Sequence, residues 1–305
     1  MQSSFSKLLL SALALFLASG SPARASVPEF SPRLPMETVF KGRDKFDRLV
    51  ALAEAENWRA LPIGERTARV GLALVGTPYV NYTLEIHDHI ESPSVNLRGL
   101  DCWTFYEVSL AFARMLRTKE PPYRPEDLLA LIEMERYRGG KCTGSFLSRM
   151  HFLEEVFADN QARGLSVNPT RQMGGQPLRR DIREMTSAWK SYRYLRNNPD
   201  LLPAMGRIQD RVSSLPVYHI PRNNVAAAEK YIRTGDVIAI TSRDESGYTS
   251  HVGLALRKAD GVHFMHATSQ RSLGRRVVVD GRISQYLKRS SDHHGIIVYR
   301  PFDLQ

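Results

Sequence analysis

The sequence predicts an α+β fold in which helices come first and a small antiparallel sheet comes last. Between about residues 36 and 232, apolar residues recur three and four positions apart, the spacing of amphipathic helices. From about residue 233 to 302 the period changes to two, and five β-prone runs follow one another. The connections between these runs are short to moderate, which favours antiparallel neighbours. Helices followed by a run of strands are typical of the α+β class.

The helical part divides into five predicted helices. The second of them has Pro62 near its start and Gly76 at its end, both common boundary residues. Residues 79–85 are β-prone, and residues 161–232 predict little more than one short helix among loops. The predicted helices are 45–58, 63–75, one that begins near residue 102 and runs past 116, 126–137 and 145–160.

The sheet part begins after Gly235. Its second and third strands are separated only by Lys258–Gly261, so we expect them to form a hairpin. A short helix around Leu287 precedes the last strand. The five predicted strands are 236–241, 251–256, 262–267, 276–280 and 295–300.

Residues 1–25 have the features of a secretory signal peptide. Lys7 supplies the positive end, residues 8–18 the apolar centre and Ala23-Arg24-Ala25 the cleavage site. The apolar run is too short to span a membrane. We therefore expect residues 26–305 to be exported, most simply to the periplasm, without a membrane span. We expect them to form a single elaborated domain that is a monomer.

The charge of the chain fits an envelope protein. Its 42 Lys and Arg residues outnumber 32 Asp and Glu, for a net charge of +10, but they form no run of five or six. Such a surface attracts anionic wall polymers and lipid head groups. Nucleic acid is not an expected partner of an exported chain.

The central helix begins at Cys102. Gly99 and Asp101 occupy the turn and N-cap positions, so the thiol lies in the first helical turn. Unpaired backbone N–H groups and the helix dipole favour an anion there, which lowers the pKa of a thiol. Cys102 is thus a candidate nucleophile. A disulfide with Cys142, the other cysteine of the chain, or an inert buried thiol remains possible from position alone.

Two histidines are suited to act with such a thiol. His251 opens the second predicted strand and His266 ends the third, so the expected hairpin brings them to the same side of the sheet. A base and a partner that orients it are what a cysteine hydrolase requires. His263 is oddly spaced from His266 and should face the other side. A zinc site built from His87, Asp88 and His89, or from the three sheet histidines, is the rival interpretation, although no HExxH or CxxC signature is present.

Several motifs resemble the NlpC/P60 superfamily of cell-wall cysteine hydrolases, and more closely its N-acetylmuramoyl-L-alanine amidase-like branch. The similarity extends over roughly residues 36–302. The motifs are Gly76-x-Pro78-Tyr79 with Leu84-Glu85, Asn96-Leu97, Asp101-Cys102-x-x-Phe105, Ser148-Arg149-x-His151-Phe152, Ser250-His251-Val-Gly253, His266-Ala267 and Gly295-Ile-x-Val-x-Arg-Pro301.

The resemblance implies a papain-like NlpC core with helical insertions that shape a narrow cleft. It implies that Cys102 is the nucleophile, His251 the base, His266 the residue that orients the base, and Tyr79 a donor to the oxyanion. No cofactor or metal is implied. The expected reaction is hydrolysis of the bond between N-acetylmuramic acid and L-alanine in soluble muropeptides. The alternatives are γ-D-glutamyl–diamino-acid endopeptidase activity, transfer to an amine in place of water, and a catalytically silent muropeptide-binding protein.

The remaining motif positions are candidate substrate contacts. A carboxylate suits a peptide amino group and an arginine suits a carboxylate, although an internal salt bridge is an equally open role for these side chains. Trp103 stands beside the nucleophile where the family has a small hydroxyl residue, and is expected to narrow the cleft. The candidate substrate-binding residues are Glu85, Asp101, Trp103, Arg149, His151 and Ser250.

Overall fold

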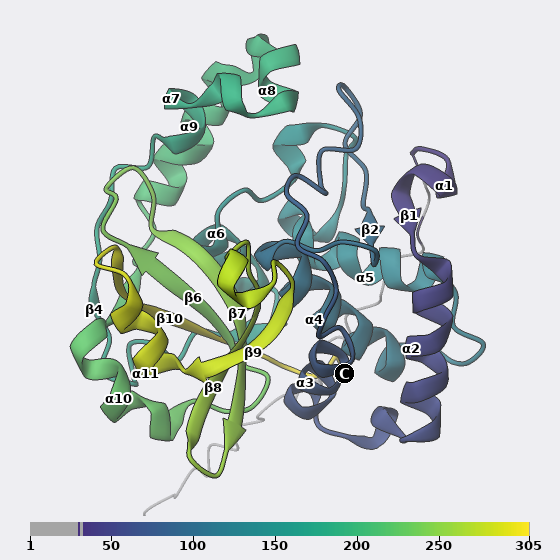
Figure 1. Ribbon diagram of the computed structural model, residues 1–305. Coiled ribbons are helices and arrows are strands. Elements are labelled where there is room, and N and C mark those ends of the chain that lie inside the picture. Colours follow the sequence, from purple (N-terminus) through teal and green to yellow (C-terminus); the bar gives the residue numbers. More distant parts are fainter. Residues whose placement is uncertain (1–29, 31–32, 305) are drawn as a thin grey trace, which may run out of the picture.

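The computed structural model describes residue 30 and residues 33–304, so the predicted signal peptide lies outside the described residues. The helices gather on two sides of one twisted sheet (Figure 1). The helices are α1 (Met36–Val39), α2 (Arg43–Ala55), α3 (Ile63–Ala73), α4 (Cys102–Thr118), α5 (Pro125–Arg136), α6 (Leu153–Ala162), α7 (Glu184–Ser187), α8 (Arg193–Asn197), α9 (Leu202–Ser213), α10 (Val225–Ala228) and α11 (Ile283–Tyr286).

The described residues form an eight-stranded antiparallel sheet and a separate two-stranded pair, so the α+β prediction is confirmed. The main order is β4-β5-β10-β6-β7-β8-β9, and β3 pairs with β10. The strands are β1 (Phe40–Lys41), β2 (Val95–Asn96), β3 (Ser166–Val167), β4 (Gln176–Pro177), β5 (Tyr218–Pro221), β6 (Val237–Ser242), β7 (Thr249–Lys258), β8 (Gly261–Ala267), β9 (Val277–Arg282) and β10 (His293–Pro301).

All five predicted strands are present, as β6 to β10. The predicted hairpin is β7–β8, with Leu254 opposite Met265. The last strand does not pair with β9, the strand that precedes it in the chain. β10 instead lies between β5 and β6 and also pairs with β3, while β4 pairs with β5. The three short strands β3, β4 and β5 come from the part of the chain predicted to be helices and loops.

The two faces of the sheet are covered differently. Alternate residues of β6 point to opposite sides, with Val237 and Ala239 packed in the core that contains α4. Ile238 and Ile240 pack instead with residues of α10 and α11. The predicted apolar stripe of α4, from Phe105 to Leu116, is fully buried. The helix is therefore fixed along its length, and its first turn, with Cys102 and Trp103, borders a cavity.

Three sequence predictions are wrong in detail. Residues 161–232, predicted to hold little more than one short helix, contain α7, α8, the 12-residue α9 and α10 as well as β3 to β5. Residues 145–160 do not form one helix: a short 3-10 turn at Phe146–Ser148 comes first, and α6 begins only at Leu153. The intervening backbone pairs with the end of α5, where Met150 N–H donates to the Arg136 carbonyl at 3.0 Å. The β-prone run 79–85 forms only an isolated bridge between Tyr79 and Leu100, followed by turns.

Candidate active site

Asp101 fixes the start of α4 and thereby the position of Cys102. The Asp101 carboxylate accepts hydrogen bonds from the backbone N–H and the hydroxyl of Thr104, both at 2.8 Å. The Thr104 hydroxyl accepts in return from the Asp101 N–H at 3.0 Å. This reciprocal capping box confirms the predicted N-cap and leaves Cys102 as the first helical residue.

The surroundings of the Cys102 sulfur act on its pKa in both directions. Burial, and the Asp101 carboxylate beside it, raise the pKa of the Cys102 thiol to about 12. The backbone amides of Val252, Trp103 and Cys102 itself lower this pKa. Burial therefore outweighs the helix start on which the sequence prediction rested. With its pKa raised, the Cys102 sulfur is a thiol at neutral pH.

The hairpin brings the two predicted histidines together. His251 Nε2 lies 2.7 Å from His266 Nδ1. Burial, and the neighbouring imidazole of His266, hold the pKa of His251 well below its usual range, so this ring is neutral and able to accept a proton. His263 faces elsewhere, as predicted, and contacts Asp260 and the Asp280 carbonyl.

His266 also contacts a carboxylate, that of Asp280, which the sequence did not predict as a site residue. His266 Nε2 lies 3.5 Å from Asp280 Oδ2, and Asp280 accepts two hydrogen bonds from Arg289, at 2.6 and 2.8 Å. Because His266 lies opposite Val278 in the sheet, Asp280 is two residues further along and on the same face. The strand register was the signal that could have found it.

Gly253 makes the close approach of β7 and β8 possible. A Cβ atom at this position would stand 2.5 Å from the Met265 carbonyl oxygen and 2.8 Å from the Cβ of His266. Neither distance is tolerated. The glycine between the two histidine positions is therefore a requirement of their contact.

Cys102 borders two adjoining cavities. The larger, of about 320 Å³, is also lined by Tyr79, Glu85, Asp101 and Arg149. The smaller, of about 180 Å³, is lined by Ser250 and His251. The residues that line both cavities are Cys102, Trp103, His151, Phe152 and Glu184.

Tyr79 lines the larger cavity with its hydroxyl protonated. Burial, and the nearby Cys102 and Asp101, raise its pKa to about 12. The Tyr79 N–H donates to the Arg275 carbonyl at 2.8 Å, which anchors the backbone at this point. The residue can therefore act as a hydrogen-bond donor at the cavity.

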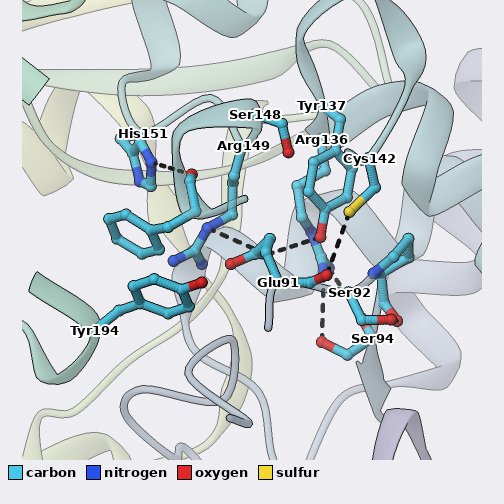
Figure 2. A network of polar contacts seen from close by, with 12 residues as sticks. Glu91, Ser92, Ser94, Arg136, Tyr137, Cys142, Ser148, Arg149, His151 and Tyr194 are labelled. Carbon is cyan, nitrogen blue, oxygen red and sulfur yellow. Dashed lines mark hydrogen bonds and ion pairs between the residues drawn. The ribbon is translucent and has the colours of Figure 1, made fainter. Parts of the chain in front are cut away.

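Arg149 forms the internal salt bridge that was one of its two expected roles, and it also lines the larger cavity. Its side chain is 7 % exposed and pairs with the buried carboxylate of Glu91, with 3.5 Å between Nε and Oε1 (Figure 2). Glu91 also accepts a hydrogen bond of 2.7 Å from the Tyr137 hydroxyl. The guanidinium lies 4.8 Å from the centre of the Phe146 ring. Arg149 is thus held in an internal ion pair while it lines the larger cavity.

Of the other candidate contacts, His151 and Glu85 have local partners, whereas the Trp103 indole has none among the described residues. His151 Nε2 lies 3.0 Å from the Phe146 carbonyl oxygen, and burial, together with the Arg149 charge, holds the pKa of His151 well below its usual range. A Glu85 carboxylate oxygen accepts from the Arg193 N–H at 3.0 Å. The Trp103 indole N–H is buried without a hydrogen-bond partner among the described residues. Ser250 is exposed at the rim of the smaller cavity.

The donors of the rival metal interpretation have other partners. His87 Nδ1 accepts hydrogen bonds of 3.0 Å from the N–H groups of His89 and Ile90, and His89 contacts Asn198. Within the described part of the chain, no three His, Cys, Asp or Glu side chains are gathered so that they could hold a metal ion. Cys102 and Cys142 are both free thiols.

Comparison with known proteins gives several structural relatives. An N-acetylmuramoyl-L-alanine amidase from Bacteroides uniformis is 28% identical, with a TM-score of 0.72, and the match covers 79% of this chain and 99% of that one. A Bacteroides fragilis protein assigned provisionally as a xylanase is also 28% identical, with a TM-score of 0.69 over 76% of this chain and 99% of that one.

A Legionella pneumophila protein of the family DUF1460 shares the fold at 19% identity, with a TM-score of 0.64 over 86% of this chain and 97% of that one. No curated protein matches the sequence. Residues 69–296 match the family described as AmiA-like, N-acetylmuramoyl-L-alanine amidase-like. Since this match includes Tyr79, Cys102, His251 and His266 and extends over most of the sequence, the chain belongs to the N-acetylmuramoyl-L-alanine amidase-like family.

Proposed function

We propose that this protein is a cysteine amidase that hydrolyses the bond between N-acetylmuramic acid and L-alanine in soluble muropeptides. The observation that carries the proposal is the arrangement at one cavity of Cys102 and His251, the latter in contact with His266. A helix that begins with a cysteine and packs on an antiparallel sheet is also the arrangement expected of a papain-like core. Membership of an amidase-like family supports an amide as the bond that is cleaved.

In the first step His251 accepts the proton of the Cys102 thiol. His251 Nε2 is in contact with His266, so Nδ1 is the nitrogen for this transfer. The Cys102 sulfur then attacks the amide carbonyl carbon, and a C–S bond forms as the carbonyl oxygen becomes an oxyanion. Asp280, held by Arg289, stabilises His266 in the orientation that supports the imidazolium.

Tyr79 and the N-terminus of α4 stabilise the oxyanion. The hydroxyl of Tyr79 and the backbone N–H of Cys102 are the donors that we assign to it. Collapse of the intermediate breaks the C–N bond, and His251 returns its proton to the leaving nitrogen. Water, deprotonated by the same imidazole, then attacks the thioester carbonyl and releases the acid and the free Cys102 thiol.

We propose that the substrate lies across both cavities, with the scissile bond at Cys102. Glu85, Arg149 and His151 contact it from the wall of the larger cavity. Trp103 contacts it from between the two cavities, and Asp101 and Ser250 border it. The sequence of residues 1–25 supports export, and we propose the periplasm as the place of action.

The test is to incubate wild type and Cys102→Ala with defined muropeptides and to identify the products by mass. Release of a free peptide that begins with L-alanine supports the proposal. Release of L-Ala-D-Glu still joined to the sugar would assign the endopeptidase activity instead. Binding without turnover would show a silent muropeptide-binding protein.

A second measurement tests the nucleophile itself. Iodoacetamide should abolish turnover in wild type and in the variant Cys142→Ser. The Cys142 thiol that this substitution removes is buried and donates to the Glu91 carbonyl at 3.5 Å. A chelator should leave turnover unchanged. Loss of activity with the chelator, or full activity of Cys102→Ala, would contradict the cysteine mechanism.

A further inference from the structure

The smaller cavity contains a carboxylate that the proposed mechanism does not use. Glu154, the second residue of α6, is 5 % exposed, and its Oε1 atom has no hydrogen-bond partner among the described residues. Its side chain lines the same cavity as Cys102 and His251. Buried carboxylates are rarely left unpaired, so this one calls for a ligand.

Glu154 also borders a third cavity, of about 220 Å³, that Arg171 lines. The smaller cavity beside Cys102 has no such compensating positive charge from the residues that the structure describes. Its described lining residues include two carboxylates, Glu154 and Glu184, and no lysine or arginine, although the chain as a whole carries a net charge of +10. The two lining histidines, His151 and His251, have lowered pKa values and are neutral. Burial raises the pKa of Glu154 to about 7, only partly opposed by its own N–H and by Thr249. An ammonium group would supply the missing charge.

Two other residues that line this cavity also have a buried polar atom without a partner. The hydroxyl of Tyr248 and the indole N–H of Trp103 are buried, with no hydrogen-bond partner in the described part of the chain. Glu154 and the Tyr248 hydroxyl can accept hydrogen bonds, whereas the indole N–H can only donate. Acceptors for an ammonium and a donor for a carbonyl are what the N-terminal residue of a peptide requires.

We propose that this cavity receives the amine that leaves when the amide is cleaved, and that Glu154 binds it as a primary ammonium. The inference rests on the proposed amide hydrolysis. Cleavage of the C–N bond, with one proton from His251, releases a neutral amine. A second proton, from the Glu154 carboxyl group or from water, converts it to an ammonium paired with the carboxylate. The Trp103 N–H is the donor for the carbonyl of the same residue.

The experiment measures binding without turnover. The full chain carrying Cys102→Ala is titrated calorimetrically with L-alanyl-γ-D-glutamate and with its N-acetylated form. We expect the free amine to bind about tenfold or more tightly, since a hydrogen bond to a charged group is involved. Adding Glu154→Gln should abolish this preference. The matched control is Glu155→Gln, the next residue, which is also buried but is paired with Arg138 at 2.8 Å and lines neither cavity.

Equal affinity of the two peptides for the Cys102→Ala chain would overturn the proposal, and this comparison does not depend on the folding of a Glu154 variant. Retention of the preference in a folded Glu154→Gln chain would overturn it as well. Tight binding of an N-acetylated tripeptide whose only amine is on the third residue would also overturn the proposal, because that amine is not the one that cleavage releases. A chain that cleaves no muropeptide but keeps the Glu154-dependent preference would contradict the proposed function alone.

Discussion

Asp101 has two effects that two substitutions can separate. Its carboxylate caps α4 through two hydrogen bonds of 2.8 Å to Thr104, and its charge contributes to the raised pKa of Cys102. Asp101→Asn keeps an oxygen that accepts from the Thr104 N–H but removes the charge. Asp101→Ala removes both.

The expected magnitudes follow from these contacts. Loss of an N-cap costs about 1 kcal/mol, whereas Asn caps nearly as well as Asp. For a protein of this size that corresponds to about 2–4 °C in the melting temperature for Asp101→Ala, and to less than about 1 °C for Asp101→Asn. Both variants should lower the pKa of Cys102, because the carboxylate no longer disfavours the thiolate.

Two assays check this prediction in a Cys142→Ser background, where Cys102 is the remaining thiol. Differential scanning calorimetry measures the melting temperature, and iodoacetamide alkylation rates against pH measure the thiol pKa. Asp101→Asn should shift the alkylation profile to lower pH with little loss of stability. An unchanged profile would refute the electrostatic argument, and equal melting of Asp101→Ala and wild type would refute the cap.

Three more perturbations test other parts of the site. Asp280→Asn should lower kcat on muropeptide about 10- to 100-fold with KM nearly unchanged, because His266 loses its charged partner. Gly253→Ala should destabilise the protein by about 1–3 kcal/mol in urea titrations, since its Cβ would force β7 and β8 apart. The folded pKa values of His219, at about 4, and of His251 lie below the usual 6.5, so these two rings contribute stability above pH 6.5 that is lost as the pH falls toward 4. Glu154, with its pKa raised to about 7, contributes with the opposite sign, so the test compares the thermal unfolding of wild type with that of His219→Asn, whose stability should fall less between pH 6.5 and 4.

The sequence predicted the features that depend on local patterns. The stripe from Phe105 to Leu116 and the Asp101 cap define α4 within one stretch of chain, and the five strands follow from their alternation. The short Lys258–Gly261 connection sufficed to predict the β7–β8 hairpin and hence the contact of His251 with His266. Local periodicity, caps and turns are encoded where they occur.

Features that depend on distant contacts could not be predicted in this way. α6 starts at Leu153 because the preceding backbone pairs with residues at the end of α5. Strands β3, β4 and β5 have two to four residues, too few to show a period. β3 and β5 form because they pair with β10, and β4 forms because it pairs with β5. Glu154 and Arg289 belong to no motif of the sequence. Their contacts with the site depend on how separate elements pack in the folded protein.

The position of β10 has a consequence for the synthesis of the protein. This strand is the last of the described strands in the chain, yet it lies in the interior of the sheet, hydrogen-bonded to β5 on one side and β6 on the other (Figure 1). The β5 and β6 edges that pair with β10 therefore stay unpaired until residues 293–301 have been synthesised. A nascent chain of this topology remains open to chaperones until then, and a ribosome that stops before His293 releases a product with two exposed, aggregation-prone strand edges.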